Sequence, residues 1–226
     1  YFNPSADRFV KNRRSLGIGL TNLAAYLAKN GYKYTDIETP EFVDILAEKL
    51  QYYLLKSSLQ LSKEKGPCPK FHLTKYSKGI LPIDTYRKSV DTIVSPELQM
   101  DWERLRSDIK EYGMRHATLT AFMPCEASSY CTNSTSGIDR PKGRVVIKTN
   151  KSDKSIFPIV TNNFRRWNYE YAFENKTNES HIKMMAIIQK YTDMSISTNL
   201  NYNYNLFENK IIPAKIINKD LFDAYK

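Results

Sequence analysis

Apolar residues recur at the spacing of an amphipathic helix in five stretches of the chain. The first stretch lies within residues 13–34, where Gly31 suits the left-handed backbone position that follows a helix end. The pattern predicts a short, half-buried helix that ends before Gly31. Its apolar stripe consists of Leu20, Leu23, Ala24 and Leu27.

A second, longer helix is predicted to begin at Thr39. The Thr39 hydroxyl can cap the first turn, Pro40 fits the first helical position, and Glu41 lies favourably near the positive end of the helix dipole. The "KGPCP" stretch should end this helix, because Gly66 and the two prolines beside Cys68 cannot continue it. The buried face is expected to carry Phe42, Leu46, Leu50, Tyr53, Leu54 and Leu61.

Three more helices are predicted further along the chain. Ser95 and Pro96 should open one that Gly113 closes, and the others lie within residues 179–197 and 212–226. Their apolar positions are, in order, Leu98, Trp102, Leu105 and Ile109; Ile182, Met185, Ala186 and Ile188; and Ile216, Ile217, Leu221 and Phe222.

Two stretches rich in β-branched and aromatic residues, 117–123 and 143–149, are predicted strands. Residues 150–155, "NKSDKS", follow as a polar turn, whereas residues 1–12 show no clear period. Strands that alternate with crossover helices predict an α/β fold with an at least partly parallel sheet, whose functional loops lie at the carboxyl ends of the strands. Because no repeat or long flexible linker interrupts it, the chain from residue 1 to 226 is expected to be a single unit.

The composition is that of a globular protein without a membrane span. Of the 226 residues 41% are hydrophobic, no run of about 18 apolar residues occurs, and no charged-then-apolar leader is present. The expected compartment is therefore the cytoplasm.

The net charge of +10 is spread out, with 18 − 14 = +4 in residues 1–113 and 16 − 10 = +6 in the rest. Such a spread is typical of a solvated surface, so no direct nucleic-acid binding is predicted.

The cysteines and histidines do not indicate a metal site or a disulfide framework. Cys68, Cys125 and Cys131 form an odd set without a secretory signal, which favours reduced thiols. The three histidines are scattered and show none of the short Cys/His spacings of a zinc site. We therefore predict that this chain binds no metal itself.

The stretch "ATLTAFMPCEASSYC", residues 117–131, leaves four interpretations of Cys125 open. As a nucleophile at a helix start, Cys125 lacks a nearby base, and Cys131 stands six residues later where a phosphatase-like loop would place Arg. As a redox pair with Cys131, it has five intervening residues instead of the two of the usual Cys-x-x-Cys motif.

The other two interpretations use the backbone and not the thiol. In one, the N–H groups of Cys125, Glu126, Ala127 and Ser128 converge at a helix start after the turn at Pro124, where unsatisfied donors and the positive helix end favour phosphate. In the other, the stretch is an ordinary capped turn after a strand. Composition alone favours these two equally.

Seven stretches in one order give the chain a resemblance to a known family. They are "RRSLGIGLTNLAAYLAKNG", "QYYLLKSSLQLSKEKGPCPKF", "YSKGILPIDTY", "DWERLRSDIKEYGMRHATLTAFMPCEASS", "NSTSGIDRPKG", "AIIQKYTDMSIS" and "KDLFDAYK". Over nearly its whole length the chain resembles the C-terminal part of the catalytic large subunit of class I ribonucleotide reductase, of the bacterial and bacteriophage type. Seven collinear matches are far more specific than any single motif.

The resemblance implies a substrate site and no catalytic residue in this chain. In the family, the stretch that here reads Pro124, Cys125, Glu126, Ala127 and Ser128 binds the substrate diphosphate, largely through backbone amides at a helix N-terminus. Other members often carry Ser or Thr where this chain has Cys125 and Ala127. We therefore expect side-chain hydroxyl contacts to be lost while the backbone donors remain.

The implied fold is the C-terminal portion of a ten-stranded α/β barrel built from two antiparallel five-stranded halves. A finger loop through its centre carries the thiyl-radical cysteine in an Asn-x-Cys-x-Glu context, which does not occur in this sequence. The N-terminal effector-binding region has no counterpart here either. The resemblance thus implies either a piece of a larger subunit or one product of a split gene for the large subunit. A viral protein of this kind would act in the host cytoplasm.

The implied reaction is the reduction of ribonucleoside diphosphates to deoxyribonucleoside diphosphates by a thiyl-radical mechanism. No cofactor is expected on this chain, because the family holds its metal or radical cofactor in the small subunit and its nucleotide effectors on the N-terminal part of the large subunit. Implied partners are that N-terminal part, the small radical-generating subunit, a second large subunit and the substrate, with no membrane. The alternative is a non-catalytic nucleotide-phosphate-binding or scaffold module derived from the barrel.

Overall fold

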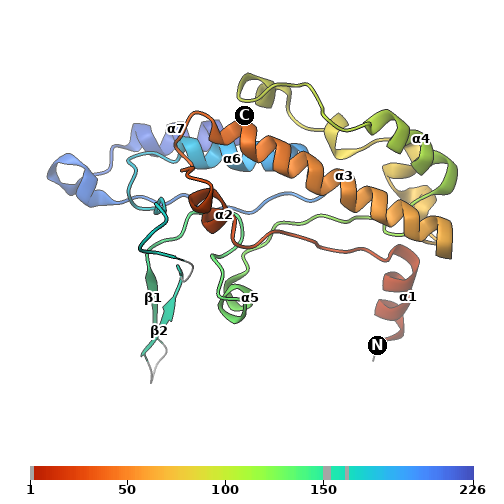
Figure 1. The fold of residues 1–226 in the computed structure, drawn as a ribbon, viewed down its shortest axis with the longest axis horizontal. Helices are drawn as coiled ribbons and strands as arrows, with labels where there is room; N and C mark the ends of the chain where they lie inside the picture. Colours follow the sequence, from red (N-terminus) through yellow and green to blue (C-terminus); the bar gives the residue numbers. More distant parts are fainter. Residues whose placement is uncertain (1–2, 150–153, 161–162) are drawn as a thin grey trace. The chain divides into compact units, whose positions relative to one another are not determined.

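The computed structural model describes residues 3–149, 154–160 and 163–226, and the chain forms two compact units. Figure 1 shows its helices and strands. One unit comprises Tyr1–Ile18, Glu41–Ala121 and Ile187–Ile196, and the other comprises Gly19–Pro40, Phe122–Ala186 and Ser197–Lys226. Each unit is therefore assembled from segments that are distant in the sequence. A single reductase-type barrel domain over residues 1–226 stays a prediction.

Helix α1, Pro4–Arg13, was not expected, because residues 1–12 carry no apolar period. A cap at its N-terminus accounts for the formation of this helix. The side chain of Asn3 accepts hydrogen bonds from the N–H groups of Ser5 at 2.9 Å and Ala6 at 3.3 Å, and Pro4 occupies the first helical position. The Asn-Pro pair was therefore a readable signal for a helix that buries none of its own residues.

Helix α3 spans Thr39–Lys65, which confirms both predicted ends. Its buried face was predicted wrongly, since Tyr53 is 55% exposed and Phe42, Leu46, Leu50, Leu54 and Leu61 are only half-buried. The buried residues are Val43, Ala47, Leu55 and Leu59 together with Thr39, Asp44, Glu48, Gln51, Ser58 and Ser62. Tertiary partners satisfy some of these polar residues, as Ser58 shows by bonding His116 Nδ1 at 2.9 Å, whereas both amide atoms of the Gln51 side chain have no hydrogen-bond partner among the described residues.

Helix α4, Trp102–Tyr112, begins six residues later than the predicted start at Pro96. Glu48 Oε1 accepts hydrogen bonds from the backbone N–H groups of Gln99 at 2.8 Å and Met100 at 2.9 Å, and from Trp102 Nε1 at 2.9 Å. These bonds hold the preceding segment outside the helix until Asp101 caps it by accepting from Arg104 N–H at 3.0 Å. The predicted end at Gly113, with φ of 71°, is confirmed.

The stretch 117–123 is not the regular strand that was predicted. It makes one isolated parallel bridge, between Ile18 and Thr120, flanked by a hydrogen bond from Ala121 N–H to the Ile18 carbonyl at 3.0 Å. The N–H groups of Leu119 and Thr120 donate to the carboxylate of Asp193 at 2.8 and 3.0 Å. A carboxylate thus takes the donors that a second neighbouring strand would need for a ladder.

In the second unit, helix α2, Leu23–Lys29, ends before Gly31 as predicted, and the predicted strand 143–149 appears as β1, Val145–Thr149. Strand β2, Lys154–Pro158, pairs antiparallel with β1 in a register that joins Val145 to Pro158 and Thr149 to Lys154. Most of the predicted polar turn, residues 150–153, lies outside the described residues. The two strands form the only multi-residue sheet in the described part of the chain.

Helices α6, Glu179–Lys190, and α7, Ala214–Tyr225, confirm the last two predicted helices. Helix α6 is buried on most sides, whereas the one buried residue of α7 is Asp220. The remaining helix, α5, spans Glu126–Cys131. Short 3-10 turns lie at Phe71–Leu73, Tyr76–Lys78, Pro82–Asp84, Lys88–Thr92, Tyr204–Leu206 and Glu208–Lys210. No helix in the described ranges is both long and apolar enough to span a bilayer.

Candidate functional site

The predicted site residues surround the start of α5. Pro124 is exposed in the turn, Cys125 is the residue immediately before the helix, and Glu126 is its first residue. Ala127 and Ser128 lie exposed in the first turn, and the first hydrogen bond inside the helix runs from Ser129 N–H to the Cys125 carbonyl at 2.7 Å. Because the N–H groups before Ser129 have no acceptor within the helix, the helix start provides donors for an anion.

The thiol of Cys125 is engaged with its own loop. Its Sγ donates to the Met123 carbonyl at 3.1 Å, and the side chain is half-buried. Cys131 lies exposed at the other end of α5, and both thiols are free. Cys68, in the first unit, is buried, and burial raises its pKa. The thiol of Cys125 thus bonds a backbone carbonyl of its own loop, while the backbone at this position leads into the helix start.

A short return segment anchors the C-terminal end of α5. Ser129 is buried, and its carbonyl accepts from Ser134 N–H at 2.9 Å. Thr135 N–H donates to Oδ1 of Asn22, the residue immediately before α2, at 2.9 Å, and Asn22 N–H donates back to the Thr135 carbonyl at 2.9 Å. Helix α5 is therefore fixed through residues 134–137 to the segment that opens α2.

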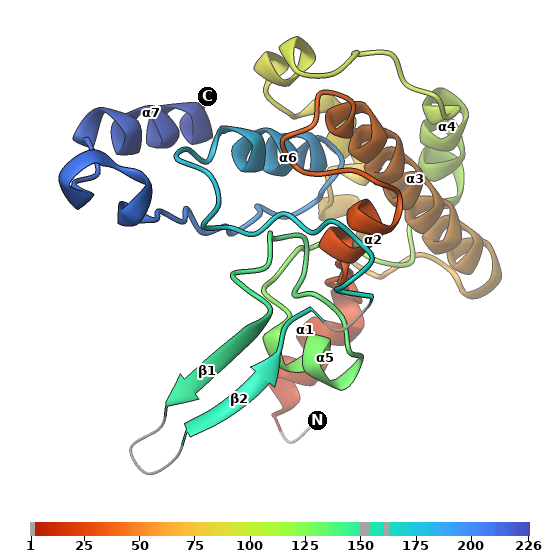
Figure 2. The same ribbon diagram turned by 60° about the vertical axis from the view of Figure 1, so that its left-hand side comes forward.

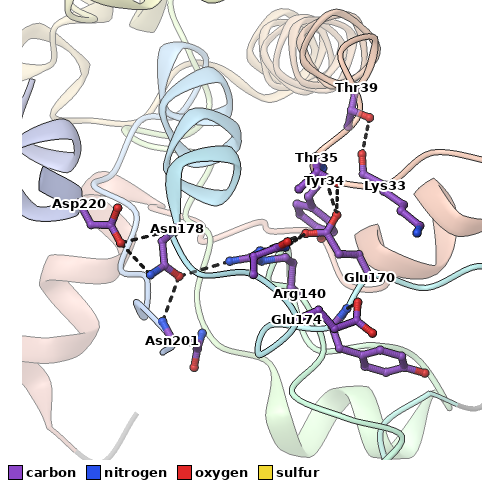
Figure 3. Close-up of polar contacts among 12 residues, drawn as sticks. Lys33, Tyr34, Thr35, Thr39, Arg140, Glu170, Glu174, Asn178, Asn201 and Asp220 are labelled. Carbon is purple, nitrogen blue, oxygen red and sulfur yellow. Dashed lines mark hydrogen bonds and ion pairs between the residues drawn. The ribbon is translucent and has the colours of Figure 1, made fainter. Parts of the chain in front are cut away.

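Beyond this segment lies a buried polar network, shown in Figure 3, that begins at Arg140. Arg140 Nη1 donates to Glu170 Oε1 at 3.0 Å, and the two side chains are only 1% and 3% exposed. Arg140 Nη2 also donates to Asn178 Oδ1 at 3.3 Å. The other Glu170 oxygen accepts from the N–H and hydroxyl of Thr35 at 3.0 and 3.1 Å. The guanidinium thus joins residues that lie far apart in the sequence.

The network continues into α7. The backbone and side-chain nitrogens of Asn178 donate to Asp220 Oδ2 at 3.1 and 3.0 Å (Figure 3). Tyr202 donates its hydroxyl proton to the same oxygen at 3.0 Å. These bonds account for the burial of Asp220 on an otherwise exposed helix. No sequence pattern singled out Arg140, Glu170, Asn178 or Asp220, because their partners are distant in the chain.

His181 makes the stability of this region depend on pH. Burial, together with the positive charge of Arg140, lowers the pKa of His181 to about 4, although Asp139 Oδ1 lies 3.5 Å from its Nε2. Nε2 bonds the Thr198 hydroxyl at 2.7 Å, and Nδ1 is buried with no hydrogen-bond partner among the described residues. The folded protein therefore resists protonation that the unfolded chain accepts near pH 6.5.

We expect acidification from pH 7 to pH 5 to remove about 2 kcal/mol of unfolding free energy through His181, because the unfolded chain then binds a proton that the folded chain does not. The stability contribution is present above the ordinary pKa and is lost as the pH falls toward about 4. Urea unfolding of the wild type and of His181→Gln at both pH values measures it. An equal pH dependence in the two proteins would contradict the assignment.

The described residues contain no group of three or more His, Cys, Asp or Glu side chains that could hold a metal ion. The geometry of this part of the chain is instead that of a small helix start whose first turn, with Ala127 and Ser128, is exposed. It can position an anion.

Comparison with known proteins identifies one protein family along the whole chain. The family model described as "Ribonucleotide reductase, barrel domain" matches residues 1–166 and 158–226. The ribonucleoside-diphosphate reductase subunit alpha of Haemophilus influenzae is 46% identical over 224 residues, which is 98% of this chain. The corresponding subunit of Enterobacteria phage T4 is 39% identical over 96% of the chain.

The relatives are much longer than this chain. The chain covers 29% of the length of the Haemophilus and phage T4 proteins, and also 29% of the ribonucleoside-diphosphate reductase 1 subunit alpha of Escherichia coli K12, to which it is 44% identical. The mixed structure of helices with a small sheet agrees with part of an α/β barrel. The match of the family model to nearly every residue, together with these identities, shows that the chain belongs to the ribonucleotide reductase family, in its barrel domain.

Proposed function

We propose that this chain is part of the alpha subunit of a ribonucleoside-diphosphate reductase and that the start of α5 binds the diphosphate of the substrate. The observation that carries the proposal is the exposed first turn of α5, with Ala127 and Ser128 at the surface, in a chain of this family. Backbone N–H groups at a helix start attract phosphate oxygens, and small side chains let the anion approach closely.

In the proposed reaction, the ribose 2′-hydroxyl is reduced after a thiyl radical abstracts the 3′-hydrogen. This chain would hold the remote diphosphate and so fix the ribose against the radical cysteine, whose Asn-x-Cys-x-Glu context is not found among these residues. A misplacement of the substrate by about 1 Å can cost on the order of a hundredfold in rate. The role of Pro124, Cys125, Glu126, Ala127 and Ser128 is therefore positioning, and no catalytic residue is assigned here.

The same proposal defines the partners and cofactors. The chain would complete a ten-stranded barrel with the polypeptide that carries the finger-loop cysteine, and would work with a small subunit that houses the metal or radical cofactor. Nucleotide effectors would bind to the N-terminal part of the large subunit, and two large subunits would associate. The non-catalytic alternative is not favoured, because the relatives that match over nearly the whole chain are named as reductase subunits.

We expect Cys125→Ser to retain most reductase activity, because this position contributes its backbone and its Sγ bonds only the Met123 carbonyl. Serine keeps a donor of similar reach, so the turn should persist. The measurement is kcat/KM for a ribonucleoside diphosphate in the reductase assembled with this chain, with calorimetric binding of the diphosphate and of the unphosphorylated nucleoside in parallel. Binding that does not require the diphosphate would refute the site, and a loss of several orders of magnitude in activity would instead give the thiol a chemical role.

A further inference from the structure

Helix α5 is too short to hold its own orientation. It contains six residues, fewer than two turns, and isolated helices of this length are unstable in water. The return hydrogen bond from Ser134 N–H to the Ser129 carbonyl anchors only its C-terminal end. The first turn, which carries the proposed phosphate donors, therefore needs another contact to fix the rotation and tilt of the helix.

An aromatic pair provides that contact. The ring of Tyr130, in α5, stacks on the ring of Phe157, in β2, with centroids 5.0 Å apart and planes inclined by 11°. Figure 2 shows α5 beside β2 of the hairpin. Tyr130 follows Ala127 by three residues, so the two lie on the same side of the helix. A shift of the Tyr130 ring therefore moves the turn that contains Ala127.

The hairpin turns one particular face toward this contact. Val146 and Phe157 are paired in register and half-buried, whereas Val145, Ile147 and Ile156 on the opposite face are 54%, 60% and 67% exposed. Phe157 is the one position of β2 that is not exposed. A two-stranded hairpin is itself marginally stable, so the stack orders the hairpin and α5 together.

We infer that Tyr130 and Phe157 are a positioning pair through which the β1–β2 hairpin holds the start of α5 in its phosphate-binding orientation and thereby sets the affinity for the ribonucleoside diphosphate. The inference rests on the proposed function of α5. In this inference the two rings contact each other and not the substrate, so both residues act through the backbone of residues 126–128. The hairpin then has a role in substrate binding although it supplies no ligand to it.

Kinetics of the assembled reductase test the pair. We expect Tyr130→Ala and Phe157→Ala each to raise KM for the ribonucleoside diphosphate about three- to tenfold at nearly unchanged kcat, in line with the strength of an aromatic pair. The double variant should be no worse than the stronger single variant, because each removes the same contact. Tyr130→Phe, which keeps the ring, should retain the wild-type KM, and Ile156→Ala, on the exposed face of the same strand, is the matched control.

Hydrogen exchange without substrate provides a readout that does not depend on the proposed function. In Tyr130→Ala and Phe157→Ala, the amides of residues 126–131 should exchange about three- to tenfold faster than in the wild type, and in Ile156→Ala they should not. Unchanged exchange, or additive KM effects in the double variant, would overturn the inference. If exchange accelerates while KM stays constant, the pair orders α5 but does not set substrate affinity, and the inference is again overturned.

The two proposals fail in different ways. If Ala127→Pro leaves KM unchanged, α5 does not bind the diphosphate and the proposed function fails, whatever the exchange rates show. If Ala127→Pro raises KM but the aromatic variants do not, the diphosphate site stands and the positioning role of Tyr130 and Phe157 is refuted. Thermal melting of each variant identifies any that fails to fold, in which case Tyr130→Leu and Phe157→Leu replace the alanine variants.

Discussion

Ala127→Pro is expected to raise KM for the ribonucleoside diphosphate by about ten- to a hundredfold, while kcat at saturation falls much less. Proline removes the N–H of the second residue of α5 and disfavours the helical conformation of the residue before it. A hydrogen bond to a charged group contributes about 1.5–3 kcal/mol, which corresponds to that range of affinity. Steady-state kinetics with the assembled reductase give both constants.

Ala127→Ser is the matched control for this substitution. Serine changes the side chain at the same exposed position but keeps the backbone N–H, so KM should stay within about threefold of the wild type. An equal loss in both variants would mean that the side chain, and not the backbone donor, governs binding. If Ala127→Pro keeps the wild-type KM, the diphosphate does not bind at this helix start.

Arg140→Leu is expected to lower the unfolding free energy by about 3–5 kcal/mol, since it leaves the carboxylate of Glu170 buried without its cation. The guanidinium also loses its bond to Asn178, so the network toward α7 is interrupted. Urea denaturation of the folded protein near pH 7 measures the change. A loss below about 1 kcal/mol would show that the pair does not stabilise the fold.

An exposed ion pair in the same unit is the control for Arg140. Lys219 Nζ lies 3.2 Å from Glu179 Oε2, but the two side chains are 53% and 45% exposed. Lys219→Met should therefore cost less than about 1 kcal/mol, because water screens the pair. The double variant Arg140→Leu with Glu170→Leu should recover part of the loss, since it removes the uncompensated charge along with its partner.

The sequence predicted helix ends better than helix faces. The end of α3 at Lys65 and the end of α4 before Gly113 follow from local residues, since glycine and proline cannot continue a helix whatever surrounds them. The prediction of which face α3 buries was wrong. Whether Glu48 or Leu50 points inward depends on the distant donors of Gln99 to Trp102, which no helical period can reveal.

Strand prediction failed where the partner was a side chain. Residues 117–123 have the composition of a strand, but a strand exists only when a neighbour accepts and donates along its length. Asp193, more than seventy residues away in the chain, takes the N–H groups of Leu119 and Thr120 instead. In contrast, β1 was predictable because its antiparallel partner follows after a short connection.

By itself, the sequence determined the family, the main helices and the position of the candidate diphosphate turn, because collinear motifs, caps and breakers are properties of neighbouring residues. The turn at Pro124 and the small residues after it indicated a helix start, which α5 confirms. Only the tertiary structure decided what supports that start. The stack of Tyr130 on Phe157 and the pairing of Arg140 with Glu170 join residues that are about thirty positions apart. Such contacts form because the folded chain brings distant segments together. A pattern of neighbouring residues does not show which distant segments will meet.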